Sequence, residues 1–388
     1  MNDFSASGVQ TEENNSLVKK TLQWLTVIFL IYMLVMAVGM IGSGFKGATK
    51  GQVGDLFAFA TNPFMGLIVG VIATAMVQSS STVTSIIVGL VAGGLPVEMA
   101  VPMIMGANIG TTITNTIVSL GHIGRNKEFR RAFAAATVHD FFNLMAVAIF
   151  LPIEIIFHPL QKAAGFLAEH FVGGENMSVK GLNFIKPITK PVIAEFKNLA
   201  HMISEQGTYI ILVIFGITII FCAIVFIGKL LKKLMVGRAK EIMHASIGRG
   251  PLTSIFSGSV VTILVQSSST TTSLMVPLAG NGVFKLKQIY PFTLGANIGT
   301  TITALLAATA ISGPTAILAL QIALVHLIYN SAAVILIYGI KNLRKIPIRG
   351  AMWLARVAAK RKIIALIYMV GVFFVTPGLM VFLYQFFA

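Results

Sequence analysis

The sequence has a single cysteine and few charged side chains. Only 11% of its 388 residues are charged, whereas about a quarter of the residues in a soluble domain carry charge. Cys222 lies within an apolar run, so the sequence allows neither an internal disulfide nor a cluster of thiol metal ligands. Hydrophobic residues make up 56% of the chain, in stretches long enough for helices across a bilayer about 30 Å thick. These features predict an all-α polytopic membrane protein.

Acidic residues are scarcer than basic ones, which leaves a net charge of +16. Lysine and arginine gather in short segments beside the apolar runs, as cytoplasmic loops require, so we expect no nucleic-acid partner. Lys19 and Lys20 precede the first apolar run and predict a cytoplasmic N-terminus. Residues 1–20 lack the basic start and small-residue cleavage site of a signal peptide, and we expect this segment to be retained.

Two polar motifs occur twice, in the same order. Gln-Ser-Ser-Ser-Thr begins at Gln78 and again at Gln266, each time between two apolar runs. Gly-Ala-Asn-Ile-Gly-Thr-Thr-Ile-Thr begins at Gly106 and again at Gly295. Each half holds three predicted crossings and one short hairpin, and an odd number of crossings inverts the second half. We therefore predict two inverted repeats, each with a re-entrant hairpin and an interrupted transmembrane helix.

The predicted organisation has five parts. They are a cytoplasmic N-terminal segment (1–21), the first inverted repeat (22–157), an extracellular linker (158–207), the second inverted repeat (208–341), and a basic surface segment with a final transmembrane helix (342–388). The hairpin arms are predicted at 55–76, 82–105, 251–265 and 270–284, and the interrupted helices are expected to begin at 106 and 288.

This arrangement favours a secondary transporter over other membrane proteins. Non-helical backbone at membrane depth is tolerated where it lines a watery cavity, and inverted repeats place the substrate between the two copies. A channel suits the hydroxyl- and amide-rich hairpins less well. An intramembrane hydrolase would need a serine with His139 and Asp140, but these neighbours point about 100° apart on a helix. The nucleophile motif Gly-x-Ser-x-Gly is also absent around the repeated serines, so we expect no enzyme.

The repeated serine motifs supply carboxamides and hydroxyls that can bind an oxyanion without a cationic side chain. Helices beginning at Ser80 and Ser268 would also direct backbone N–H groups at the anion. A single serine in a membrane helix often only bonds the preceding turn, but repetition at matched positions argues for a site. The candidate anion ligands are Gln78, Ser79, Ser80, Ser81, Gln266, Ser267, Ser268 and Ser269.

Sodium is the expected coupling ion, because the spans hold almost no cation to balance a bound anion. Unwound backbone at 106–110 and 295–299 would expose carbonyl oxygens to a cation. A carboxylate inside the membrane, here Asp140, is also expected to mark a functional site. The candidate sodium ligands are Asn108, Thr111, Thr112, Asp140, Asn143, Asn297, Thr300, Thr301 and Thr303. For His139 and His326 we favour helix–helix contacts over a ligand role, and Asn330 is left open.

These motifs, together with the stretch from Phe129 to Asp140, resemble those of the type II sodium-dependent phosphate cotransporters over residues 60–345. The resemblance implies sodium-driven uptake of inorganic phosphate by alternating access, with the serine motifs as phosphate site and the Asn-Ile-Gly-Thr-Thr segments as sodium sites. It implies no cofactor beyond Na⁺ and a place in a bacterial plasma (inner) membrane. Asp140, with Ala134 and Ala136, matches the electrogenic members. Sulfate or a dicarboxylate as substrate, and a homodimer as assembly, stay open.

Overall fold

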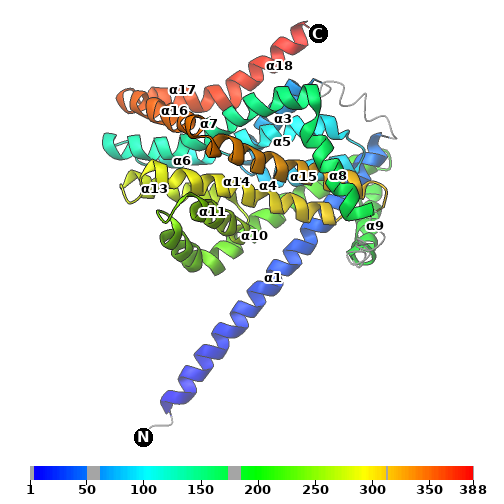
Figure 1. Cartoon of the computed structure of the whole chain (residues 1–388). Coiled ribbons are helices and arrows are strands. Elements are labelled where there is room, and N and C mark those ends of the chain that lie inside the picture. The colour runs from blue at the N-terminus through cyan, green and yellow to red at the C-terminus, as the bar shows by residue number, and fades with distance from the viewer. Residues whose placement is uncertain (1–3, 50–61, 174–184, 312, 388) are drawn as a thin grey trace.

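The described part of the chain is helical throughout (Figure 1). The computed structural model describes residues 4–49, 62–173, 185–311 and 313–387, and within these ranges it contains no strand. Six of the described helices are long and apolar enough to cross a membrane. They are Thr21–Thr49, Asn126–Phe157, Thr208–Leu231, Leu286–Thr309, Ala316–Tyr338 and Ile363–Tyr384. The prediction of an all-α, multi-pass membrane protein is thereby confirmed.

In the first half of the chain, short helices lie between two long ones. The first short helix begins after Asn62, whose side chain accepts a hydrogen bond from the backbone N–H of Phe64. Pro63 occupies its first turn, where the missing N–H has no partner to lose. The elements are α1 (Phe4–Thr49), α3 (Pro63–Val77), α4 (Ser80–Ala92), α5 (Val97–Gly110), α6 (Ile113–Leu120) and α7 (Asn126–Phe157).

The second half follows the same succession of helices and then adds a C-terminal segment. A π-helical turn (Val334–Tyr338) extends the last helix of the repeat, and a second one (Gly371–Val375) lies before Pro377 in the final span. The elements are α10 (Thr208–Ser246), α11 (Pro251–Val265), α12 (Ser268–Ser273), α13 (Met275–Gly280), α14 (Leu286–Thr309), α15 (Ala316–Ala333), α16 (Lys341–Lys360), α17 (Ile363–Val370) and α18 (Thr376–Phe387).

The segment predicted as a linker is helical where the structure describes it. It contains α8 (Pro159–Gly173) and α9 (Ile185–Ile203). Buried Glu154, near the end of α7, accepts hydrogen bonds from the backbone N–H groups of Leu160 (2.8 Å) and Gln161 (3.0 Å). A carboxylate therefore caps the start of α8, where the helix dipole favours negative charge.

The second hairpin arm is shorter than predicted. We expected it to run over residues 82–105, but α4 ends at Ala92 and residues 97–110 form the separate helix α5. Gly94 has φ 119°, a conformation that favours glycine, and Pro96 follows it, so the chain turns between the two helices. Most of the first predicted arm lies in α3, and its residues 55–61 lie outside the described ranges.

The prediction of unwound backbone in the repeated glycine motifs was wrong. Residues 106–110 are the last part of α5, and residues 295–299 lie within α14. The first half is interrupted later, at Thr111 and Thr112, between α5 and α6. Helix α14 is unbroken from Leu286 to Thr309, so the interrupted helix expected in the second half is not found there.

Close helix packing explains these glycines instead. Helix α5 packs along α3, and α14 packs along α11. A Cβ atom at Gly106 would collide with the carbonyl oxygen of Leu67, and one at Gly295 with the carbonyl oxygen of Ile255. Small residues let the backbones of two membrane helices approach closely. The resulting van der Waals packing is one of the forces that hold helices together in lipid.

We expect Gly295→Ala to destabilise the protein by about 1–3 kcal/mol, because the added methyl group must push α11 and α14 apart. The matched control is Gly371→Ala, since nothing lies within 4 Å of the Cβ position there. Thermal unfolding of both variants in detergent measures the difference. A melting temperature of Gly295→Ala equal to that of the wild type would contradict the close contact.

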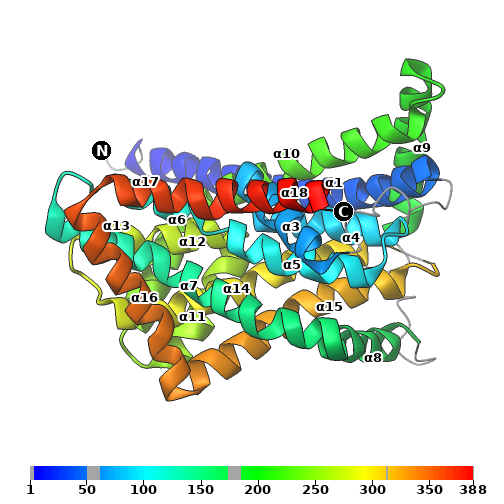
Figure 2. The ribbon, with the colours of Figure 1, turned by 90° about the horizontal axis from the view of Figure 1, so that it is seen from above.

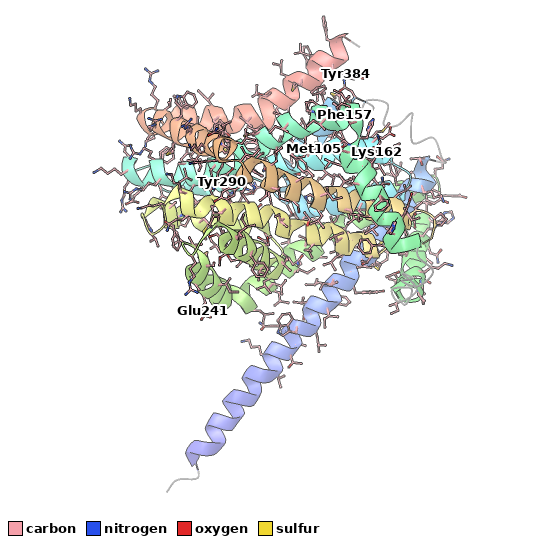
Figure 3. All side chains as sticks on the ribbon, viewed as in Figure 1. Met105, Phe157, Lys162, Glu241, Tyr290 and Tyr384 are labelled. Atoms are coloured by element: carbon pink, nitrogen blue, oxygen red, sulfur yellow. The ribbon has the colours of Figure 1, made fainter. Side chains whose placement is uncertain are left out.

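Basic residues follow α6 (Arg125, Lys127), α13 (Lys285) and α16 (Arg361, Lys362), and these three places lie at one end of the helix bundle (Figures 1 and 2). Figures 1 and 2 show α6, α13 and the corner between α16 and α17 at this end, with α8 and α9 at the opposite end. Side chains fill the space between, and Figure 3 shows Met105 and Tyr290 inside the bundle, whereas Glu241 and Tyr384 lie at its edge. We call the end with α6, α13 and the α16–α17 corner the basic end.

Candidate functional site

The two serine turns, residues 78–81 and 266–269, begin with the same backbone geometry. Gln78 follows α3 with φ 55°, and Gln266 follows α11 with φ 54°. Both lie in the left-handed region, which residues other than glycine seldom adopt. The repeated sequence thus folds into a repeated turn, between α3 and α4 in the first half and between α11 and α12 in the second.

The next residue of each turn caps the following helix. The Oγ atoms of Ser79 and Ser267 accept hydrogen bonds from the backbone N–H three residues on, at 3.2 and 3.1 Å. Helices α4 and α12 consequently begin at Ser80 and Ser268, as predicted. The capping role uses these two hydroxyls locally and leaves the later serines of each turn for other partners.

Three serines of these turns are largely buried as residues, and their hydroxyls form no hydrogen bond in the described part of the chain. Ser80 and Ser268 are each 3% exposed and Ser81 is 4% exposed, yet none of the three forms a side-chain hydrogen bond there. Ser269 differs, because its hydroxyl donates to the carbonyl of Thr111 at 3.5 Å. A hydroxyl without a partner is free to donate, so these positions are suited to a ligand that supplies acceptors.

The glutamines of the two turns have different surroundings. Gln266 Oε1 accepts a hydrogen bond from the Thr303 hydroxyl at 3.0 Å, and its Nε2 donates to the carbonyl of Ile263 at 2.7 Å. Gln78 is exposed, and Thr114, the sequence counterpart of Thr303, has a buried hydroxyl without a partner. A glutamine of the serine turns is therefore bonded to a candidate sodium ligand in the second half, and Gln78 has no such bond among the described residues.

Four asparagines and two histidines from both halves form one buried cluster, which we call the amide cluster. The Nδ2 group of Asn108 donates to Oδ1 of Asn330, and that of Asn297 donates to Oδ1 of Asn143 at 2.8 Å. The same side chains also reach the backbone of their own half. Asn143 donates to the carbonyl of Asn108 at 2.8 Å, and Asn330 to that of Asn297 at 3.2 Å.

The histidines complete the amide cluster across the two halves. His139 Nε2 lies 2.7 Å from Oδ1 of Asn297, and His326 Nε2 lies 3.3 Å from Oδ1 of Asn108. The expected helix–helix contacts of both histidines are confirmed, and their buried Nδ1 atoms have no partner in the part of the chain that the structure describes. The amide groups of the candidate sodium ligands here bond one another, so this cluster joins the two halves of the bundle.

The threonines after the repeated asparagines bond their own helices. Thr111 and Thr300 each donate to the carbonyl four residues earlier at 2.9 Å. Thr112 and Thr301 donate to the carbonyl three residues earlier, at 2.9 and 2.7 Å. A hydroxyl that donates its hydrogen keeps its oxygen lone pairs, so each of the four can still coordinate a cation.

Asp140 is a fully buried carboxylate with no cationic partner in the described part of the chain. Its Oδ2 accepts a hydrogen bond from the hydroxyl of Tyr368 at 3.0 Å, and its Oδ1 has no partner. The side chain of Thr112 lies next to the same carboxyl group. A buried charge needs a counter-ion or several hydrogen bonds. Among the described residues Asp140 has hydrogen-bond donors near its carboxyl group but no counter-ion.

Tyr368 could not be predicted as a partner of Asp140, because it lies in α17 outside both repeats, where no motif marks it. Asn330, which the sequence left open, follows His326 by four residues as Asn143 follows His139, and this match is the signal that relates it to the candidate ligand Asn143. The two serine turns do not hydrogen-bond each other within the described residues. Each instead packs on the opposite half, through α4 on α14 and α15 and through α12 on α6.

The residues of these candidate sites lie within segments that match a known protein family. The family model described as Na+/Pi-cotransporter matches residues 33–173 and 219–352, which include both serine turns, the amide cluster and Asp140. This chain belongs to the Na+/Pi-cotransporter family. The resemblance found in the sequence is confirmed, and Tyr368 lies outside the matched segments of this family member.

Curated relatives of this Na+/Pi-cotransporter family member are transport proteins by name. The chain is 33% identical to human sodium-dependent phosphate transport protein 2B, over 91% of this chain and 64% of the relative. It is 33% identical to rat sodium-dependent phosphate transport protein 2A, over 93% of this chain and 67% of the relative. The chain thus spans about two thirds of the length of these relatives. No solved structure matches it.

Proposed function

We propose that this family member takes up inorganic phosphate together with sodium ions and has no enzymatic activity. The observation that carries the proposal is a set of largely buried serines at the starts of α4 and α12 whose hydroxyls have no hydrogen-bond partner among the described residues. Relatives named as sodium-dependent phosphate transport proteins support the choice of ions. The proposal places the chain in a plasma (inner) membrane with its basic end and N-terminus in the cytoplasm, following the excess of lysine and arginine there.

In this proposal the phosphate lies at the serine turns and is bound by neutral donors. Ser80, Ser81 and Ser268 offer hydroxyls that have no partner among the described residues. Helix α4 directs its first backbone N–H groups and the positive end of its dipole to the same region. The remaining members of the phosphate set are Gln78, Ser79, Gln266, Ser267 and Ser269. Their capping bonds and the bond to Thr303 hold the turns in shape.

Sodium ions balance the phosphate charge in this proposal. Phosphate near neutral pH is largely divalent, so two sodium ions make a neutral complex and a third makes uptake electrogenic. Asp140 supplies a buried negative charge beside Thr112, which supports a third cation site at that place. The neutral ligands proposed for sodium are Asn108, Thr111, Thr112, Asn143, Asn297, Thr300, Thr301 and Thr303.

Alternating access is proposed to arise from two inverted repeats that move against each other. Each short hairpin rests on the opposite half: α4 contacts α14 and α15, and α12 and α13 contact α6 and α7. A shift of one half therefore carries the opposite hairpin with it, and the site between them would open to one side at a time.

Uptake of labelled phosphate into proteoliposomes tests the proposal. We expect an inward sodium gradient to drive accumulation, whereas an equal potassium gradient does not. Excess unlabelled phosphate should compete with the label, and excess sulfate or dicarboxylate should not. Uptake that ignores sodium would overturn the coupling, and equal competition by sulfate would favour a broader oxyanion carrier.

We expect Thr303→Val to weaken sodium activation more than phosphate affinity. The variant removes a neutral oxygen from the proposed cation set and leaves Gln266 Oε1 without its donor, at a cost of about 1 kcal/mol or roughly fivefold in the sodium concentration needed. Higher sodium should restore the rate. Thr309→Val on the same helix, where the hydroxyl only bonds the carbonyl of Leu306, is the control. Identical sodium activation curves for Thr303→Val and the wild type would remove Thr303 from the site.

A further inference from the structure

Two neighbouring cavities at the basic end are lined by cationic side chains. One has a volume of 560 Å³ and lies between the start of α7, the turn before α14, and α16. The other, of 540 Å³, lies between α7 and α16. Arg130 and Arg356 line both, and no carboxylate lines either one. The cationic lining residues are Lys127, Arg130, Arg131, Lys285, Arg356 and Lys360.

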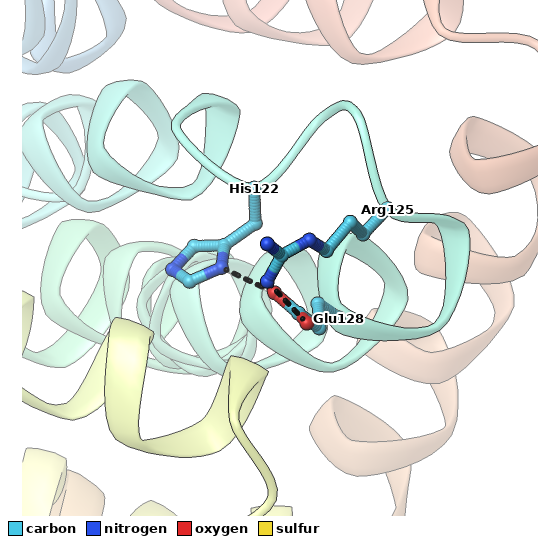
Figure 4. A network of polar contacts seen from close by, with 3 residues as sticks. All are labelled: His122, Arg125 and Glu128. Carbon is cyan, nitrogen blue, oxygen red and sulfur yellow. Dashed lines mark hydrogen bonds and ion pairs between the residues drawn. The ribbon is translucent and has the colours of Figure 1, made fainter.

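The charge of these cavities is not neutralised by the described part of the protein. The nearby carboxylate of Glu128 is engaged by Arg125 at 2.9 Å and by His122 at 3.4 Å (Figure 4). None of the six lining cations forms an ion pair with a described residue. Like charges held close together repel, so this part of the fold is more stable with a multivalent anion bound.

The cavities open where a membrane surface would lie. Trp353 and Met352, on the same turn of α16, line one cavity each and are 58% and 41% exposed. Tryptophan beside arginine and lysine is typical of the level of lipid headgroups, where the ring meets the acyl chains and the cations meet phosphate. Helix α16 follows a membrane-spanning helix and precedes another, which keeps it at this surface.

We propose that the two cavities bind the headgroup of an anionic phospholipid that carries two phosphate groups. One phosphate occupies each cavity, and Arg130 and Arg356 lie between them. Arginine suits this role because its planar guanidinium group binds phosphate oxygens through two parallel hydrogen bonds. Basic pockets between membrane helices on the cytoplasmic side are suited to such headgroups.

A bound lipid would join three elements that are otherwise held together by few polar contacts. Arg131 of α7 lies against Gly282 in the turn before α14, where a Cβ atom would touch its guanidinium group. Arg356 belongs to α16, and its Nε donates only to the carbonyl of Met352 in its own helix. The lipid therefore ties α16 to both halves of the bundle.

Native mass spectrometry of the purified full chain, titrated with cardiolipin as the two-phosphate lipid, tests the proposal. We expect the double variant Arg130→Gln/Arg356→Gln to bind cardiolipin about 30-fold more weakly, at about a factor of five for each cation lost. The control Lys341→Gln/Arg349→Gln removes the same charge from exposed sites of α16 outside both cavities, and it should bind like the wild type. Equal loss in both variants would overturn the proposal.

Two measurements on the wild-type protein identify the ligand without relying on a variant. Cardiolipin should raise the melting temperature more than phosphatidylglycerol does at equal phosphate concentration. Inorganic phosphate in large excess should leave cardiolipin bound. Equal stabilisation by phosphatidylglycerol would exclude the two-phosphate geometry. Displacement by inorganic phosphate would show that the cavities bind a free anion and not a lipid.

Discussion

Replacing Asp140 with asparagine is expected to make phosphate uptake insensitive to membrane potential while leaving part of the transport. The carboxylate is fully buried, and among the described residues one of its oxygens has no partner and no cation pairs with it. Removing its charge removes the reason for an additional sodium ion to bind at that depth. Uptake then carries two sodium ions for each divalent phosphate and moves no net charge.

The size of this effect follows from the work done by the membrane potential. One elementary charge moved across 100 mV gains about 2.3 kcal/mol, which corresponds to about 50-fold in the limiting accumulation ratio. The measurement is uptake into proteoliposomes whose potential is set with potassium and valinomycin. The wild-type chain should respond to an inside-negative potential, and Asp140→Asn should not.

Tyr368→Phe is the control for Asp140→Asn. It removes the hydroxyl that donates to Asp140 at 3.0 Å but keeps the carboxylate, so uptake should still respond to potential. A wild-type rate that ignores potential would refute electrogenic uptake. A response of Asp140→Asn as strong as that of the wild type would show that another group binds the charge-carrying sodium.

Removing the hydroxyls of Ser80 and Ser268 together is expected to lower the affinity for phosphate strongly. Both residues are largely buried and neither hydroxyl has a partner among the described residues, so each is free to donate to a dehydrated anion. A lost contact of this kind costs about 1–3 kcal/mol, so two such losses predict an affinity at least about 30-fold lower for Ser80→Ala/Ser268→Ala. Phosphate dependence of uptake at saturating sodium measures it.

A serine that bonds its own helix provides the comparison. The Ser273 hydroxyl donates to the carbonyl of Thr270 at 3.0 Å, and it lies on α12, as Ser268 does. Ser273→Ala should therefore transport with wild-type affinity. If the double variant also transports with unchanged apparent affinity, the phosphate site lies away from the serine turns.

Local structure was predictable wherever short-range chemistry decides it. The helix starts at Ser80 and Ser268 follow from a serine that caps the next turn and from apolar runs on both sides. The length and apolarity of the runs predicted the spans, because lipid forces the backbone to satisfy its own hydrogen bonds. The shared residues of the two halves also sufficed to recognise the family.

The role of the repeated glycines was not predictable in the same way. Gly106 and Gly295 occur beside asparagines and threonines, a composition equally compatible with unwound backbone and with close helix packing. Which of the two applies depends on the group that faces each glycine. Gly106 faces the carbonyl of Leu67, and Gly295 faces the carbonyl of Ile255, each on another helix. Information about a facing backbone is absent from the local sequence.

The sequence by itself determined the helical class, the two serine turns and the family, because each depends on composition, on neighbouring residues or on exact repetition. Only the tertiary structure decided which polar groups meet. It pairs Asn108 with Asn330 and His139 with Asn297 across the two halves, and it brings Tyr368 from the last span to Asp140. These contacts join residues more than 150 positions apart, and their geometry is set by how whole helices pack, which no local pattern encodes.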